Sequence, residues 1–268
     1  MTRLLIACWL VLATAYPAQA QSWPQPPSGL RLDGGGSVAV TFNATGTSGR
    51  ETSKSSPQTI AITVAAGSDL IMLVGISHSG PFDGITISGV SSSVDGAFTV
   101  VPSSGITKGA IRTEIWRLLN PTVGAHTISV TWASGTISVI TSGAVAANDA
   151  DVGGTPLGTA STASGTTQAA SVSPASASGE LAFAVTGVDN SGSPTLAVTA
   201  GTQRWITTSS ATQEAGGSTI DGAGPTVTLS WSITGAGNQD WAASGVSVKA
   251  AAGGGRTTKN TRAWPLGV

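Results

Sequence analysis

The sequence predicts an all-β protein, a two-sheet antiparallel β-sandwich of jelly-roll type that is built from two related halves. Three observations lead to this prediction. Apolar and polar residues alternate over short segments, as in residues 127–132, where Ile128, Val130 and Trp132 alternate with hydroxyl residues. Turn signals rich in Gly, Pro, Asn and Ser recur about every 8 to 12 residues. Finally, no window shows sustained helical periodicity.

A pattern that occurs twice predicts the two related halves. The alternation described above returns at residues 226–233. The first alternating segment is followed by SVITSGAVAAN, and the second is followed by the similar DWAASGVSVKA. GELAFAVTGV in the second part also matches GSDLIMLVGI in the first. We therefore expect one domain over residues 37–250, with halves at about 37–148 and 156–249. Two tandem sandwiches of about 100 residues each, divided near Gly153, are the alternative.

The expected strands follow one another with turns between them. Residues 70–74 are apolar on both faces, as expected for a central strand that is covered on each side. After Asn148 a polar stretch, DADVGGTPLGTASTASGTT, predicts a long connection between the halves. The expected strand segments are 37–42, 58–64, 69–78, 85–90, 96–101, three within 112–148, and then 168–174, 179–189, 194–200, 203–209, 218–233 and 240–250.

The composition restricts the classes of partner. Charged residues make up 9% of the chain, against about 25% in an average soluble domain, and the formal net charge is −1. The chain therefore carries no field of one sign, and neither a basic stripe nor interleaved aromatic and basic residues indicate nucleic acid as a partner.

Residues 1–20 predict a secretory signal peptide. Arg3 precedes an apolar run, and PAQA then matches an A-x-A cleavage site before Gln21. A lipoprotein signal is the alternative, because LIAC spells a lipobox that ends at Cys8, but this leaves too short an apolar run. We expect a secreted protein, extracellular or at the cell surface, without a membrane span. Because Cys8 is the only cysteine, the mature chain would have no thiol.

Both ends of the mature chain predict segments outside the sandwich. Residues 21–36 are rich in Pro and Gly, which predicts an exposed leader or linker. Residues 251–268 predict a flexible basic tail. The alternative for this tail is a small docking peptide anchored by Trp264.

Five pieces of the sequence carry a resemblance. They are RTEIWRLLNPTVGAHTISVTW, AVAANDADVGGTPLG, TQRW, AGGSTIDGAG and LSWS followed by DWAASGVSVK, and they span most of residues 38–249. Together they resemble a recurrent, mostly uncharacterised jelly-roll-type β-sandwich module of secreted bacterial proteins and of phage or metagenomic structural proteins. The resemblance implies the fold and an extracellular role, and it implies no catalytic residue. Where related modules have aromatics, as before Asn148, this chain often has Ala.

No pattern in the sequence indicates an enzyme. Serine hydrolysis needs a Ser activated by a His, but no G-x-S-x-G elbow occurs, and His78 and His126 stand at expected strand ends. Glycoside hydrolysis needs two neighbouring carboxylates, whereas Glu114 and Glu180 are far apart in the sequence. A hydrolase whose acids converge only in the fold is an alternative hypothesis.

The best candidate metal ligands are the oxygens of Asn148, Asp149 and Asp151. Asp189, at the equivalent strand end of the second half, could join them in a structural Ca²⁺ site. Asn and Asp also cap ordinary turns, which is the alternative interpretation. No other cofactor is expected.

Tryptophans are the candidate carbohydrate-binding residues, because exposed indoles stack on sugar rings. Trp241 shares its strand face with small residues, so it could be such a platform, or it could cover a glycine in the next strand. Trp205 and Trp116 fit either role, and Arg204 or Arg117 could stack on a ring.

The leading hypothesis is a secreted, non-enzymatic β-sandwich that acts as an adhesion or surface-assembly module. The alternative is a carbohydrate-binding, lectin-like domain that uses exposed tryptophans. The expected partner is an extracellular or cell-surface glycan or protein. Strand edges with few charges also permit self-association.

Overall fold

The strands account for all regular secondary structure in the part of the chain that the structure describes. The computed structural model describes residues 37–47, 51–54, 56–79, 86–133, 137–189, 194–207, 213–235 and 237–251. The predicted all-β class is therefore confirmed. Within these ranges, no helix has the length and apolar character needed to cross a membrane. The predicted signal peptide (1–20), leader (21–36) and basic tail (251–268, apart from Ala251) lie outside the described residues.

The strands fall into two sequence blocks, before and after residues 149–160. The first block contains β1 (Thr41–Thr47), β2 (Glu51–Lys54), β3 (Gln58–Val64), β4 (Ile71–Ser79), β5 (Ile87–Ser92), β6 (Gly96–Ala97), β7 (Thr99–Val100), β8 (Ile106–Lys108), β9 (Ile111–Leu119), β10 (Gly124–Trp132) and β11 (Ile137–Asn148). The second contains β12 (Ser161–Gly165), β13 (Ala169–Val172), β14 (Leu181–Asp189), β15 (Thr195–Ala200), β16 (Thr202–Thr207), β17 (Gln213–Asp221), β18 (Leu229–Thr234) and β19 (Trp241–Val248). The expected connection after Asn148 thus contains a strand, β12, whose small residues carry no apolar alternation.

The strands pair into four antiparallel sheets. The first outer sheet has the order β3-β10-β5-β6, and the first inner sheet has the order β1-β11-β4-β9-β7, with β2 on β11 and β8 on β9. The second inner sheet is β12-β19-β14-β17-β16, and the second outer sheet is β13-β18-β15. The predicted two-sheet sandwich is therefore corrected to four sheets. Period-two alternation indicates which face of a strand is dry, but not how many sheets share the strands.

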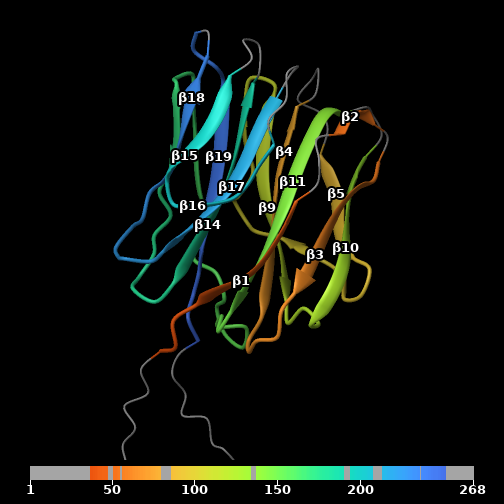
Figure 1. Ribbon diagram of the computed structural model, residues 1–268, viewed down its shortest axis with the longest axis vertical. Helices are drawn as coiled ribbons and strands as arrows, with labels where there is room; N and C mark the ends of the chain where they lie inside the picture. The colour runs from red at the N-terminus through yellow and green to blue at the C-terminus, as the bar shows by residue number, and fades with distance from the viewer. Residues whose placement is uncertain are drawn as a thin grey trace, which may run out of the picture. The chain divides into compact units, whose positions relative to one another are not determined.

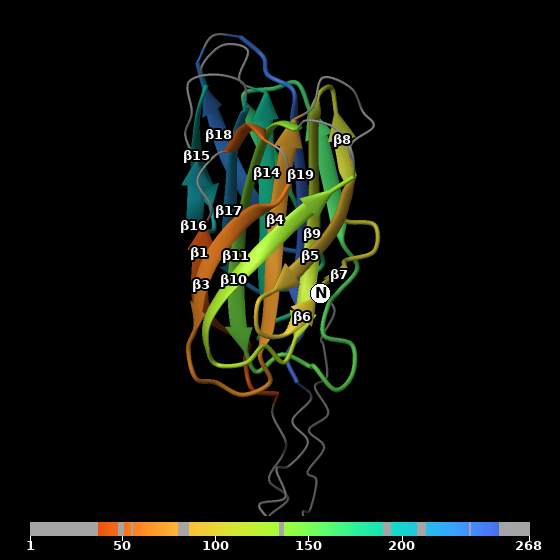
Figure 2. The ribbon, with the colours of Figure 1, turned by 90° about the vertical axis from the view of Figure 1, so that its right-hand side faces the viewer.

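The four sheets lie as successive layers. Figure 1 shows the second outer sheet (β15, β18) on the left, the two inner sheets in the middle and the first outer sheet (β3, β5, β10) on the right. The inner sheets contact each other mainly through β4 and β9 on one side and β14 and β19 on the other. Figure 2 shows the first outer sheet from its exposed face, with β10 and β5 in front of β4 and β9. We call the interface between the two inner sheets the seam.

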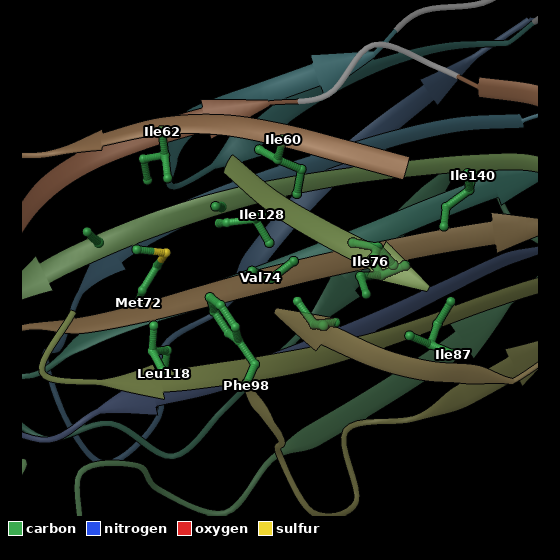
Figure 3. Packing of buried hydrophobic residues seen from close by; sticks show 14 of the residues in the cluster. Ile60, Ile62, Met72, Val74, Ile76, Ile87, Phe98, Leu118, Ile128 and Ile140 are labelled. Atoms are coloured by element: carbon green, nitrogen blue, oxygen red, sulfur yellow. The ribbon is translucent and has the colours of Figure 1, made fainter. Parts of the chain in front are cut away.

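The core of the first pair of sheets follows from the predicted alternation. Along β3, QTIAITV, buried and exposed residues alternate without interruption. Its Ile60 and Ile62, together with Ile128 of β10, contact Met72 and Val74 of β4 in one apolar cluster. Figure 3 shows these side chains facing each other across the two layers.

Strands β4 and β14 are buried on both faces. All residues of β4 are buried, as the apolar character of residues 70–74 predicts. In β14 every residue from Leu181 to Val188 is buried as well. Each strand lies inside an inner sheet, so an outer sheet covers one face and the other inner sheet covers the second.

One end of the seam is apolar and closely packed. Ile71 and Leu73 of β4 lie in one cluster with Phe183 and Val185 of β14. Gly75 makes this approach possible, because a Cβ at that position would lie only 2.8 Å from the Cβ of Val185.

The other end of the seam is lined by small and hydroxyl residues. Gly187 faces Ser77 so closely that a Cβ on the glycine would overlap the serine hydroxyl. Beside this contact, the hydroxyls of Thr113 and Ser244 are 2.8 Å apart and share a hydrogen bond. Ser244 also donates a hydrogen bond to the carbonyl of Ser104, at 2.5 Å. The inner sheets are therefore joined by direct contacts along the whole seam.

Candidate functional site

The predicted calcium ligands Asn148 and Asp149 form a turn that is closed by protein groups. The carboxamide of Asn148 donates to the Thr41 hydroxyl at 3.2 Å and accepts from the Asn43 carboxamide at 2.7 Å. The carboxylate of Asp149 accepts a hydrogen bond from the Ser68 hydroxyl at 2.6 Å. Asp149 has a φ of 60°, in the left-handed region that Asp tolerates better than most residues. This part of the cluster thus matches the turn alternative.

The same turn brings the two ends of the described chain together. Thr41, at the start of β1, pairs with Asn148. Near the other end of the described chain, the amide of Ala251 donates to the carbonyl of Asp149 at 3.0 Å. Ala250 forms a bridge with Ala150 beside it. The chain therefore enters the first inner sheet and leaves the second next to each other, at one end of the sheets. We call this end the entry end.

Asp151 and Asp189 do not complete a calcium site. The Asp151 carboxylate accepts a hydrogen bond from the amide of Thr155 at 3.0 Å. Asp189 is the last residue of β14, whereas Leu181, its first, pairs with Val248 near the entry end. A strand rises about 3.3 Å per residue, so Asp189 lies roughly 25 Å along β14 from that end. The expected cluster is corrected accordingly, and in the described ranges no group of three His, Cys, Asp or Glu side chains could hold a metal ion.

Two of the three candidate carbohydrate-binding tryptophans are core residues. Trp241 is 7% exposed and donates a hydrogen bond to the Thr167 hydroxyl at 3.2 Å. Its ring covers Gly165 of the neighbouring strand, where a Cβ would lie 2.7 Å from the indole. Trp205 is 3% exposed and lies in the seam between Gly143 of β11 and Gly217 of β17. Neither indole presents a free face, so the expectation of exposed rings is corrected for both.

Trp116, the third candidate, is half-buried and belongs to a charged ladder on β9. Its indole NH donates to the Glu114 carboxylate at 2.8 Å. Arg112 binds the other oxygen of that carboxylate at 3.4 Å. Glu114 is 4% exposed, so these two donors stabilise a buried charge, and the indole contact fixes the ring against the sheet.

Arg204 stacks on a ring, as its sequence position allowed. Its guanidinium lies 3.5 Å from the centroid of the Phe42 ring and therefore links the edge of the second inner sheet to β1 of the first. Its Nε also donates to the Thr219 hydroxyl at 2.7 Å. Burial lowers the pKa of Arg204, and the negative charge of Asp221 opposes that shift.

His126 meets a serine and an aspartate, but not in the arrangement of a catalytic triad. Both the Ser92 hydroxyl, at 3.0 Å, and the Asp95 carboxylate, at 3.3 Å, approach the same ring nitrogen, Nδ1. The other nitrogen, Nε2, lies 2.7 Å from the carbonyl of Thr122. In a triad the acid and the serine bind opposite nitrogens, whereas here both approach Nδ1, so the arrangement differs from that of a triad.

His78 is buried without a hydrogen-bond partner. It is 4% exposed, and both ring nitrogens lack a partner in the described structure. Burial, together with the positive charge of Arg112 on the adjacent strand, lowers the pKa of His78 from 6.5 to about 4. The folded state therefore favours the neutral imidazole.

The buried neutral state of His78 predicts a loss of stability in acid. Its pKa is lower in the folded chain than in the unfolded chain, so the unfolded chain binds a proton here more readily. The free energy of unfolding is therefore unaffected by this group above about pH 6.5 and decreases as the pH falls towards 4. A difference of 2.5 pKa units corresponds to about 3 kcal/mol. Urea unfolding at pH 7 and pH 4 measures how much the free energy of unfolding falls between the two pH values. We expect this fall to be about 3 kcal/mol smaller in the His78→Leu variant than in the wild type. Equal losses in the two proteins would contradict this assignment.

Arg117, which the sequence suggested only as a residue that could stack on a ring, lines an open hollow. It lies on β9 and pairs with Leu73, and its side chain is half-buried. The hollow has a volume of about 300 Å³ and lies between the turn that follows β7 and residues 157–160 before β12. The sequence signal was only a second arginine on a strand that also contains Arg112 and Glu114, and this does not show what Arg117 faces.

No family model, curated protein or solved structure matches the chain.

Proposed function

We propose that the chain is a secreted, non-enzymatic β-sandwich protein that acts as an adhesion or structural assembly module on an extracellular surface. The single observation that carries the proposal is the adjacency of the two ends of the described chain, near Thr41 and Ala251, at the Asn148–Asp149 turn. Attachment of the chain near Thr41 or near Ala251 would hold the protein by its entry end. The exposed faces of both outer sheets and the opposite end of the sheets would then remain free. This arrangement suits a module that is held at one end and makes contacts with the rest of its surface.

The chemistry of the candidate residues supports a non-enzymatic role. Glu114 is held by Arg112 and Trp116, and both nitrogens of His126 face bonded groups. Glu180 accepts hydrogen bonds from the Ser247 hydroxyl and the amide of Ala177. Each of these groups has a structural use in the fold, and His126 meets Ser92 and Asp95 through the same nitrogen, which is not the arrangement of a triad.

The finer architecture in this proposal is a tandem pair of related sandwiches. Its support is the strand order: β3-β10-β5 and β1-β11-β4-β9 in the first block correspond to β13-β18-β15 and β12-β19-β14-β17 in the second. Gly75 and Gly187 occupy matching places in β4 and β14, paired with Ile115 and Ala215 respectively. The residues before these partners, Glu114 and Glu214, are both buried.

An orientation experiment tests the proposed function. The chain without residues 1–20 has no cysteine, so a single introduced cysteine fixes its orientation on a bead. Ser37→Cys attaches the protein by its entry end. Thr234→Cys, at the last residue of β18, attaches it by the opposite end of the sheets. We expect beads carrying the Ser37→Cys protein to be retained on polysaccharide-coated or cell surfaces at least several-fold better than beads carrying the Thr234→Cys protein. Absence of retention in both orientations, with no assembly visible by size exclusion or negative stain, would contradict the proposal.

A further inference from the structure

The hollow beside Arg117 has one wall that is fixed by the turn after β7. In this turn the amide of Ser104 donates to the carbonyl of Val101 at 3.2 Å, and the amide of Val101 donates to the carbonyl of Ile115 at 2.8 Å. The Ser104 hydroxyl is buried and binds both the amide and the carbonyl of Ile115, at 3.0 and 3.2 Å. These bonds hold the wall in place without a ligand, so binding does not have to offset the entropy cost of ordering it.

The opposite wall is held to β19 in the same way. Leu157 forms a bridge with Val248, and the amide of Gly158 donates to the carbonyl of Ser247 at 2.8 Å. The amide of Lys249 donates to the carbonyl of Pro156 at 2.9 Å. The hollow therefore lies at one edge of the seam, between a pre-formed wall of the first sequence block and a pre-formed wall of the connection between the blocks. Interfaces of this kind are frequent places for small-molecule sites.

Arg117 supplies the charge of the hollow. Within the described residues its guanidinium takes part in no hydrogen bond, ion pair or ring contact, whereas Arg112 binds Glu114 and Arg204 stacks on Phe42. No acidic side chain is among the lining residues. A guanidinium presents donors in a planar fork that fits a carboxylate with two parallel hydrogen bonds. The unpaired fork makes a carboxylate the matching ligand group.

The remaining lining residues indicate what the carboxylate is attached to. The exposed hydroxyl residues Ser103 and Thr159 stand on the two walls, and the apolar Pro102 and Leu157 also line the hollow. A volume of about 300 Å³ accommodates one compact ring rather than an extended chain. A sugar ring with a carboxylate has this combination of an apolar face, hydroxyl groups and one negative charge.

We infer that this hollow binds a hexuronic acid residue of an acidic polysaccharide, with Arg117 holding the carboxylate and Ser103 and Thr159 contacting the ring hydroxyls. The inference goes beyond the proposed function, because it names a site and a ligand class. A second hollow, of about 320 Å³, is lined by residues 39–42 of the first block and by residues of the second block that include Glu180 and Asp221. Its acids would repel the same ligand, so the charge of Arg117 distinguishes the two.

Calorimetric titration of the chain without residues 1–20 with trigalacturonate tests the inference. We expect Arg117→Gln to raise the dissociation constant at least 10-fold and Arg117→Lys to raise it less, because lysine keeps the charge but lacks the fork. Thr159→Ala should raise it a few-fold. Lys108→Gln, which removes a positive charge elsewhere on the same edge, is the matched control and should leave binding unchanged. Circular dichroism and thermal unfolding check that each variant is folded.

Several results would overturn the inference. They are no binding of trigalacturonate by the wild type, equal binding by wild type and Arg117→Gln, or binding of neutral maltotriose as tight as that of trigalacturonate. Acetate binding as tightly as trigalacturonate would reduce the hollow to a simple anion site and overturn the sugar assignment. The bead experiment tests the adhesion proposal separately. If beads carrying the Arg117→Gln protein are still retained, adhesion stands but does not depend on the uronate site.

Discussion

Replacing Trp205 by alanine is expected to lower the free energy of unfolding by about 3 to 5 kcal/mol. The indole is 3% exposed and fills the seam between Gly143 of the first inner sheet and Gly217 of the second. The indole contacts both inner sheets, so the alanine variant would lose apolar contacts on two sides. It would also leave a cavity between the two sheets, which other contacts along the seam hold in place. Urea denaturation of the wild type and the variant measures the effect.

Two further variants keep this prediction testable if the alanine protein does not fold. Trp205→Phe removes only part of the ring and should cost clearly less than Trp205→Ala. Gly143→Ala should destabilise the wild type, because its Cβ would overlap the indole, but should be much less harmful in the Trp205→Phe background. Additive effects of the two substitutions would contradict the described contact, as would a cost below about 1 kcal/mol for Trp205→Ala.

Replacing Gly187 by valine is expected to cost about 3 kcal/mol, because overpacking forces backbone shifts. A Cβ at this position would overlap the Ser77 hydroxyl and would lie 3.0 Å from both the Ser77 Cβ and the Ile111 Cγ2. These atoms belong to the first inner sheet, so the added side chain must push the two inner sheets apart. Thermal and urea unfolding of the variant report the loss.

The matched control is Gly153→Val, since a Cβ on Gly153 meets no atom within 4 Å. This substitution should change stability by less than about 1 kcal/mol. Ser77→Gly removes the atoms that the valine would strike, so it should recover part of the loss in a double variant. If Gly187→Val unfolds like the wild type, the inner sheets are not in the close contact described.

The fold class and much of the core could be predicted from the sequence because they depend on local periodicity. The alternation in QTIAITV became the buried and exposed faces of β3, and the double-sided apolar run at residues 70–74 became the covered strand β4. The division into four sheets could not be predicted in this way. A strand that faces a second sandwich has the same pattern as a strand at the centre of one large sandwich.

The candidate site shows the same limit at the level of single residues. The turn that the sequence offered as the alternative at Asn148 and Asp149 is present, since Asn and Asp favour turns. Their side chains, however, bind Asn43 and Ser68, which are far away in the sequence and could not be identified from it. The sequence also could not indicate that Asp189 lies at the far end of β14, because strand direction in the second block depends on long-range pairing. For Trp205, the decisive neighbours are glycines in two other strands, one of them in the other sequence block.

The adjacency of Thr41 and Ala251 at the entry end has a topological consequence. A host protein could accept residues 41–251 as an insert in a single surface loop, since the two junctions would be close together and the host backbone would scarcely need to widen. The same closeness permits a circular permutant, with the old ends joined by a short linker and new ends opened at the exposed Gly153–Gly154 step, outside all the sheets. The β-sheets could thus be carried in the middle of a larger chain as readily as at its terminus.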